Sequence, residues 1–257
     1  MDNDYISVTE IGGDEVTQEQ IDRLCNRYYW AGHHCAGKDV VEAACGSGQG
    51  LGYLDGIARS LEAGDFSEEV LSVARHHYGG RIPLERFDAQ KMPFDDKSKD
   101  VIILFEAIYY LPDVEEFIKE CIRVLRPGGC VLIATANKDL YDFNPSPHSH
   151  TYYGVVELNE LISSHGFKTE FFGDTPVGDA SVRQRILRPV KKVAVTLGLI
   201  PKTMAGKKIL KRLVFGELAR MPAEINGDTS RYVEPTRITS VRPDTIHKVI
   251  YCVATLR

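Results

Sequence analysis

Residues 40–50 combine an acidic side chain with a glycine-rich turn, a pairing suited to binding a small polar ligand. Val40 and Val41 are typical of a parallel strand that is buried on both faces, and Glu42 follows at its end. Gly46 and Gly48 would let the backbone approach a ligand without obstruction by a side chain. We therefore expect an adenosine-containing ligand to bind here, at the carboxyl edge of an open α/β sheet.

The spacing of the glycines excludes two common nucleotide sites. A dinucleotide site needs G-x-G-x-x-G, and no register that starts at Gly46, Gly48 or Gly50 supplies the final glycine. A P-loop is excluded because no Gly-Lys-Ser or Gly-Lys-Thr follows the turn. An acid four residues before the first turn glycine suits a positively charged ligand that has no pyrophosphate.

The run from Glu42 to Gly48 resembles motif I of the class I SAM-dependent methyltransferases, D/E-x-G-x-G-x-G, with Ala44 in place of the first glycine. SAM (S-adenosylmethionine) carries an ammonium and a sulfonium and no phosphate, which agrees with an acid at this place. The resemblance implies that motif I contacts SAM through Glu42, Ala44, Cys45, Gly46, Ser47 and Gly48.

Further stretches resemble the same family in the same order, over roughly residues 38–136. Asp65 lies 23 residues beyond Glu42, near the spacing at which an acid meets ribose hydroxyls; the alternative is a plain turn residue. The stretch that starts at Asp88 resembles D-A-x-x-L-P-F, so Asp88 would bond the adenine amino group and Ala89 would pack on the ring. Residues 99–105 resemble the fourth strand, which ends beside the methionine part of SAM. The remaining contacts implied are Phe66, Ser67, Gln90, Phe105, Glu106 and Tyr110.

Residues 26–31, Asn-Arg-Tyr-Tyr-Trp-Ala, resemble an R-Y-x-W stretch that precedes motif I in many relatives. Tyr28 would then close over the bound cofactor. The alternative is that these aromatic residues pack the N-terminal helix on the sheet.

The alternation of apolar strands with helical patterns predicts an α/β fold, a doubly wound and mostly parallel seven-stranded sheet of Rossmann-like type. We expect one domain over residues 1–257, with residues 1–37 as an N-terminal helical cap. The family likeness implies that the last two strands pair antiparallel. Strands are expected near 39–43, 61–65, 82–87, 99–105, 129–136, 167–173 and 247–255, and helices near 17–31, 50–59, 67–77, 113–125 and 154–164.

Residues 174–246 separate the last two expected strands. Their charge and their apolar spacing predict a basic helical insertion. Between Arg183 and Arg212 there are ten basic residues and no acids, and apolar residues recur at helical spacing. Three interpretations stay open: a lid over the site, a helix pair in peripheral contact with an anionic membrane through 183–212, or a cleft for an anionic substrate such as a phosphorylated or acidic glycan. Nucleic acid is disfavoured as a partner because the net charge of the whole chain is −5, so the rest of it would repel phosphates.

The loop after the fifth strand, residues 136–153, is where we expect the acceptor to bind. It resembles bacterial methyltransferases of surface-polysaccharide and sugar biosynthesis, which implies O-methylation of a hydroxyl on a sugar, glycan or glycolipid, with S-adenosylhomocysteine as product. His150, and after it His148, are candidate bases because histidine titrates near neutral pH. Alternatively, both bind the acceptor or cap the next helix.

Two other functions stay open, a lipid or quinone methyltransferase at the membrane surface and a non-catalytic SAM-binding protein. We expect no metal cofactor, because no carboxylate cluster with ligand spacing lies near this loop. The six cysteines lack CxxC spacing, and no apolar run resembles a leader or a membrane span, which predicts a cytoplasmic protein that is at most peripheral on the membrane. The sequence does not indicate an oligomeric state.

Overall fold

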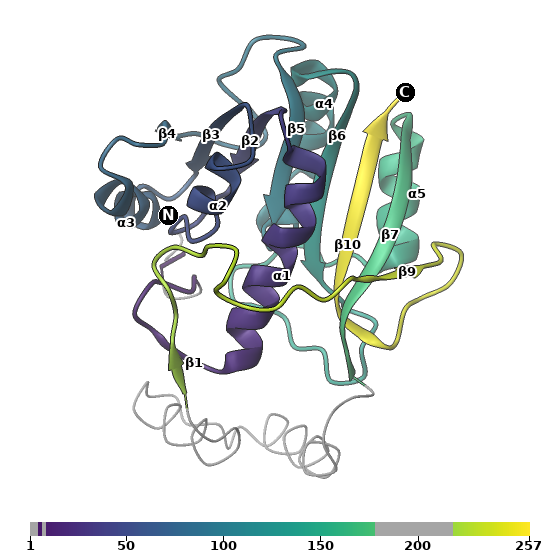
Figure 1. The fold of residues 1–257 in the computed structure, drawn as a ribbon. Helices are drawn as coiled ribbons and strands as arrows, with labels where there is room; N and C mark the ends of the chain where they lie inside the picture. The colour runs from purple at the N-terminus through teal and green to yellow at the C-terminus, as the bar shows by residue number, and fades with distance from the viewer. Residues whose placement is uncertain (1–4, 7–8, 178–217) are drawn as a thin grey trace.

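A central eight-stranded sheet organises the computed structural model, which describes residues 5–6, 9–177 and 218–257 (Figure 1). The strand order is β4-β3-β2-β5-β6-β10-β7-β9, and the first five of these strands run parallel. The strands are β2 (Asp39–Ala43), β3 (Ser60–Asp65), β4 (Leu84–Arg86), β5 (Lys99–Phe105), β6 (Leu125–Ala136), β7 (Phe167–Pro176), β9 (Thr236–Ile238) and β10 (His247–Leu256). The expected antiparallel pairing of the last two long strands is confirmed, since β10 pairs with β7 from Leu256↔Phe167 to His247↔Pro176.

Helices cover both faces of the sheet, as expected for a doubly wound fold. Adjacent strand residues point to opposite faces. Val40 and Ile103 therefore pack on one core with helices α1 (Gln18–Cys35), α2 (Leu51–Asp55) and α3 (Glu68–Tyr78). Val41 and Ile102 pack on the other core with α4 (Val114–Val124) and α5 (Val155–Ser164). The fold class predicted from the sequence is thus confirmed.

Polar caps fix where the helices around the carboxyl edge begin. Thr17 and Gln20 form a capping box at the start of α1. The Ser67 hydroxyl accepts a hydrogen bond from the Val70 N–H at the start of α3, and two glutamates in the first turn complement the helix dipole. These caps fix the residues at which α1 and α3 begin.

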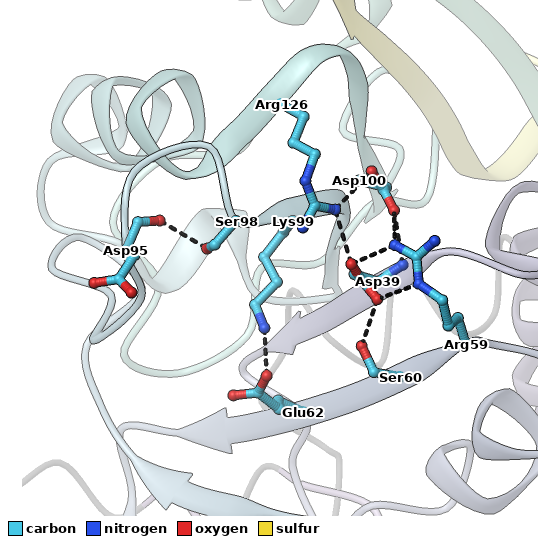
Figure 2. Close-up of polar contacts among 9 residues, drawn as sticks. All are labelled: Asp39, Arg59, Ser60, Glu62, Asp95, Ser98, Lys99, Asp100 and Arg126. Atoms are coloured by element: carbon cyan, nitrogen blue, oxygen red, sulfur yellow. Dashed lines mark hydrogen bonds and ion pairs between the residues drawn. The ribbon is translucent and has the colours of Figure 1, made fainter.

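A network of charged residues joins the strands at the opposite edge of the sheet, near their amino ends (Figure 2). Arg126 bonds Asp39 and Asp100, each at 2.8 Å, and Arg59 also donates to Asp39 through Nε at 2.8 Å. The Arg59 guanidinium holds the pKa of the Asp39 carboxyl well below its usual range. This network ties β2, β5 and β6 together far from the carboxyl edge, so we assign it to stability.

Several elements differ from the sequence expectations. Helix α2 has five residues instead of the expected ten, because Gly56 ends it. Strand β9 adds an eighth strand at the edge of the sheet, antiparallel to β7. A separate two-stranded sheet pairs β1 (Glu15–Val16) with β8 (Ala219–Arg220).

Residues 218–246, the described end of the predicted insertion, contain short strands and loops and no helix. The two predicted basic helices within 183–212 lie outside the described residues. Among the described helices, none combines the length and the apolar character needed to cross a membrane.

Candidate active site

A cavity of about 420 Å³ lies at the carboxyl edge of the parallel strands, where ligands bind in open α/β sheets. Its volume is within the range of about 300–1,000 Å³ that is typical of small-molecule sites. Thirteen of the sixteen residues predicted to contact SAM line it: Tyr28, Glu42, Ala44, Cys45, Gly46, Asp65, Phe66, Asp88, Ala89, Gln90, Phe105, Glu106 and Tyr110.

The glycine-rich turn lines part of the cavity, and three of its residues have a left-handed backbone conformation. Ala44, Gly46 and Gly48 have φ angles of 64°, 58° and 82°. Such angles suit glycine, whereas an alanine there bears a strain of roughly 1–2 kcal/mol. Ala44 therefore adopts the conformation of the glycine that it replaces in the motif.

Gly48 and Ser47 do not line the cavity, and their contacts hold the turn against α3 and the N-terminal segment. A Cβ on Gly48 would lie 3.0 Å from the Cβ of Ala74, so Gly48 lets α3 pack closely on the turn. The Ser47 hydroxyl donates to the Glu10 carbonyl at 3.0 Å, which joins the turn to the N-terminal segment. Ser67, the third predicted contact outside the cavity wall, caps α3.

Glu42 lines the cavity and has a buried carboxyl oxygen without a hydrogen-bond partner. Its Oε1 accepts a hydrogen bond from the Tyr28 hydroxyl at 2.6 Å, and its Oε2 is buried with no hydrogen-bond partner. Burial raises the pKa of this carboxyl to about 8. An orphaned buried oxygen of this kind fits a cationic donor such as the ammonium of SAM.

Tyr28 packs on the sheet, as one of the two expectations for the N-terminal aromatic residues has it, and its closing over the cofactor stays a prediction. Its ring packs edge-on against Phe105, with 5.4 Å between ring centroids, and lies so close to Gly50 that a Cβ there would be 2.1 Å from the ring. The same side chain lines the cavity and holds Glu42. Tyr28 thus packs α1 on the sheet and forms part of the cavity wall.

Asp65 lies at the end of β3 and is bonded to the turn. Its Oδ2 accepts from the Gly46 N–H at 2.9 Å and its Oδ1 from the Ser67 N–H at 2.8 Å. Burial raises the pKa of this carboxyl. A carboxylate oxygen has room for a further donor, so Asp65 can bind ribose hydroxyls while it fixes the turn.

Asp88 and Ala89 form the side of the cavity where the resemblance places the adenine ring. Asp88 Oδ1 accepts from the Gln90 N–H at 2.8 Å, which holds the carboxylate in a tight turn. Ala89 is buried and Phe87 lies beside it on the wall. This combination of a carboxylate and apolar surface suits a flat base with an amino group.

Glu106 follows β5, the strand beside β2, and lines the cavity as well. Its φ of 51° is a strained conformation of the kind that clusters at functional sites. Tyr109 donates its hydroxyl to Glu106 Oε2 at 3.1 Å, and Arg27 Nη1 lies 3.6 Å from Glu106 Oε1. The wall therefore offers an anion, a cation and a phenol to whatever binds beside the cofactor.

The two predicted catalytic histidines are exposed, and neither lines the cavity. The backbone N–H of His150 donates to the Tyr109 carbonyl at 2.7 Å, and the His148 ring lies 6.3 Å from the ring of Tyr5, which does line it. The loop that carries them therefore borders the cavity. Their role as bases stays a prediction.

The sequence reasoning missed the contribution of the N-terminal residues to the cavity wall. Helix α1 presents one face to the cavity through Gln20, Arg23, Leu24 and Arg27, and Glu10 precedes it on the same wall. The spacing of three and four residues was the available signal, since such residues share one face of a helix. Among the described residues, no group of three or more His, Cys, Asp or Glu side chains could hold a metal ion.

Comparison with known proteins agrees with this geometry. Residues 41–133 match the family model described as a methyltransferase domain. A "probable S-adenosylmethionine-dependent methyltransferase" of Mycolicibacterium smegmatis is 35% identical over 147 residues, which cover 56% of this chain and 57% of the relative. A phthiotriol/phenolphthiotriol dimycocerosates methyltransferase of Mycobacterium ulcerans is 35% identical over 127 residues, which cover 46% of this chain and 45% of the relative. The chain thus spans about half the length of the curated relatives that it matches.

A solved SAM-dependent methyltransferase from Thermotoga maritima has the same fold. It superimposes with a TM-score of 0.60 at 12% sequence identity, and the match covers 93% of this chain and 91% of that one. At this identity the likeness concerns the fold alone.

Proposed function

We propose that this chain is a class I SAM-dependent methyltransferase and that it methylates a hydroxyl oxygen on a sugar, glycan or glycolipid. One observation carries the proposal: the acids that suit SAM and a wall of tyrosines with Glu106 face the same cavity. A methyl donor and a hydroxyl acceptor can therefore meet there.

The cofactor side of the cavity would hold SAM through three carboxylates at the strand ends. Glu42 would bind its ammonium, Asp65 its ribose hydroxyls and Asp88 its adenine amino group. When bound, SAM supplies a methyl group that is already strongly electrophilic because it is attached to a sulfonium. The protein must then position an oxygen near it and exclude competing water.

The acceptor side would orient the hydroxyl and take up its proton. A hydroxyl is a poor nucleophile at neutral pH, so a positioned base accelerates its reaction by about 10²–10⁴-fold. Glu106 lies on the cavity wall, and its contacts with Tyr109 and Arg27 fix its direction. We infer that Glu106 accepts the proton, with His150 and His148 as the alternative bases in the bordering loop.

The aromatic wall supports an acceptor with a ring or an apolar body. Tyr109 and Tyr110 come from the short 3-10 helix η1 (Ile108–Tyr110). The ring of Tyr5 packs edge-on against that of Tyr110, with 5.6 Å between the ring centroids. The Tyr110 hydroxyl is 2.6 Å from the Ser146 hydroxyl in the loop that resembles sugar methyltransferases. These residues present flat apolar faces next to hydroxyl groups, as sugar sites do.

A lipid acceptor is the second candidate. It is favoured by the Mycobacterium ulcerans relative, which is named for a lipid methylation and is 35% identical over 127 residues. In that case the basic residues of 183–212 would contact the membrane, and the protein would act at its cytoplasmic surface.

Methyl-labelled SAM distinguishes these acceptors. The pure protein is incubated with the label and an extract of its source, and the lipid, glycan and protein fractions are counted. Label in a glycan or glycolipid fraction, released as a methylated sugar by acid hydrolysis, supports the proposal. Label confined to a lipid without sugar would establish the second candidate instead, and label on protein would refute both.

A further inference from the structure

Arg23 is a cation on the cavity wall that has no partner among the described residues. Its side chain is partly buried, its Nε is fully buried without a hydrogen bond, and it forms no ion pair with a described residue. A partly buried guanidinium that lacks an anion is unfavourable, because burial removes water without replacing its hydrogen bonds. An arginine in this state is suited to receive an anion from a ligand.

The position of Arg23 separates it from the predicted cofactor contacts. Arg27, one helical turn later in α1, lies 3.6 Å from Glu106 at the end of β5. Arg23 is about 6 Å further along the helix axis, toward its beginning. Figure 1 shows that the first turns of α1 extend beyond the carboxyl ends of the strands, where the cofactor acids lie. Arg23 therefore lines the cavity from a position nearer to the start of α1 than Arg27.

Arg23 and Arg27 are the cations among the described residues that line the cavity. Asp65 and Asp88 line the cofactor side and would repel an anion there, while Glu10, which also lines the cavity, accepts a hydrogen bond from Gln20. SAM has a single carboxylate, and Arg27 is the arginine nearer to its expected methionine end. Arg23 is thus left for a second anionic group, one that the acceptor carries.

We propose that Arg23 binds an oxyanion of the acceptor, a phosphate or a carboxylate, and so selects acidic acceptors. This inference rests on the proposed function, because it assigns the substrate class of the same cavity. A guanidinium can donate two parallel hydrogen bonds to either oxyanion, which fixes the orientation of the acceptor as well as its affinity. The hydroxyl to be methylated would then lie on the side of the anion that faces Glu106.

The first test is the charge of the methylated product. Product labelled from methyl-labelled SAM in a source extract is passed over an anion exchanger at neutral pH. We expect retention; loss of retention after phosphatase treatment would identify a phosphate, and loss after carboxyl amidation would identify a carboxylate. A neutral labelled product would overturn the inference while leaving the proposed methyl transfer intact.

The second test uses Arg23→Gln, Arg23→Lys and a control with the same charge change, Arg242→Gln, which is exposed and outside the cavity. When the acceptor in the extract is limiting, we expect Arg23→Gln to lower the rate of methyl labelling by about 10- to 100-fold. This is the effect of losing one charge-assisted contact. Arg23→Lys should recover part of that rate, and Arg242→Gln should match the wild type. The affinity for SAM, measured by calorimetry, should change less than about twofold in all three. A large loss of SAM affinity in Arg23→Gln would assign Arg23 to the cofactor and refute the inference.

A third measurement does not depend on turnover. Inorganic phosphate is added to the protein saturated with S-adenosylhomocysteine, and the melting temperature is recorded. Phosphate should raise it in the wild type and in Arg242→Gln, and by less in Arg23→Gln, because a ligand stabilises only the state that binds it. Equal shifts in all three would exclude an anion site at Arg23, even if no methylated product were found.

Discussion

Replacing Glu42 with glutamine should remove a large part of the pH dependence of stability in the cofactor-free protein. Burial raises the pKa of the Glu42 carboxyl to about 8, whereas a glutamate in an unfolded chain titrates near pH 4.3. The folded protein therefore keeps this proton over a range in which the unfolded chain has lost it. The free energy of unfolding should fall as the pH rises from about 4 to about 8.

The magnitude follows from the difference between the two pKa values. Each pKa unit corresponds to about 1.36 kcal/mol, so the full difference corresponds to a loss of at most about 5 kcal/mol between pH 4 and pH 8. Glutamine can accept the hydrogen bond of Tyr28 but does not titrate. Its unfolding free energy should therefore decline much less over this range.

Urea unfolding at several pH values, followed by circular dichroism, tests this expectation. The control is Glu85→Gln, which removes an exposed carboxyl outside the cavity and should retain the wild-type slope. Parallel curves for the wild type and Glu42→Gln between pH 5 and pH 8 would refute the reasoning. They would mean that Glu42 is ionised in the folded protein.

Three further predictions concern the turn, the base and the charged network. Ala44→Gly should raise the free energy of unfolding by about 1 kcal/mol in urea, because glycine adopts the φ of 64° without the strain of alanine; a loss of stability would contradict this. Glu106→Gln should lower kcat by about 100-fold or more, and His150→Gln should lower it by less, when label transfer is measured at saturating SAM. A larger loss of kcat in His150→Gln than in Glu106→Gln would make the histidine the base. Asp39→Asn should lower the free energy of unfolding fully at pH 7 and by progressively less as the pH falls below about 4, because the contribution of a carboxyl with a depressed pKa is complete above its unfolded pKa and is lost as the pH falls toward its folded pKa; a loss that does not change with pH would exclude the ionic contribution.

The sequence predicted that the strand-end acids would gather at one edge of the sheet, and they line the cavity there, because their positions depend on local patterns. A strand that ends in Glu42, and another that ends in Asp65, place their acids at one edge once both strands join a parallel sheet. Their order along the chain and the family resemblance were sufficient for this side. Gly48 lies outside the cavity wall and allows α3 to pack closely on the turn, and its contact with the ligand stays a prediction.

The other wall could not be predicted, because it depends on contacts between distant segments. The N-terminal segment is held by β1, which pairs with β8 about 200 residues later, and no local pattern indicates that pairing. How α1 crosses the strand ends decides that Arg23 and Arg27 face the cavity. Strand β9 has three residues, too few for an alternating pattern to be recognised.

The central claim, that this cavity binds SAM through its strand-end acids, is tested most directly by calorimetric titration of SAM into the pure protein. We predict one site per chain in the wild type and in Asp95→Asn, which alters an exposed acid outside the cavity. In Asp65→Asn the affinity should fall by about 10-fold or more, because a charge-assisted contact to the ribose is lost. Wild-type affinity in Asp65→Asn, or no binding by the wild type, would contradict this account of the site.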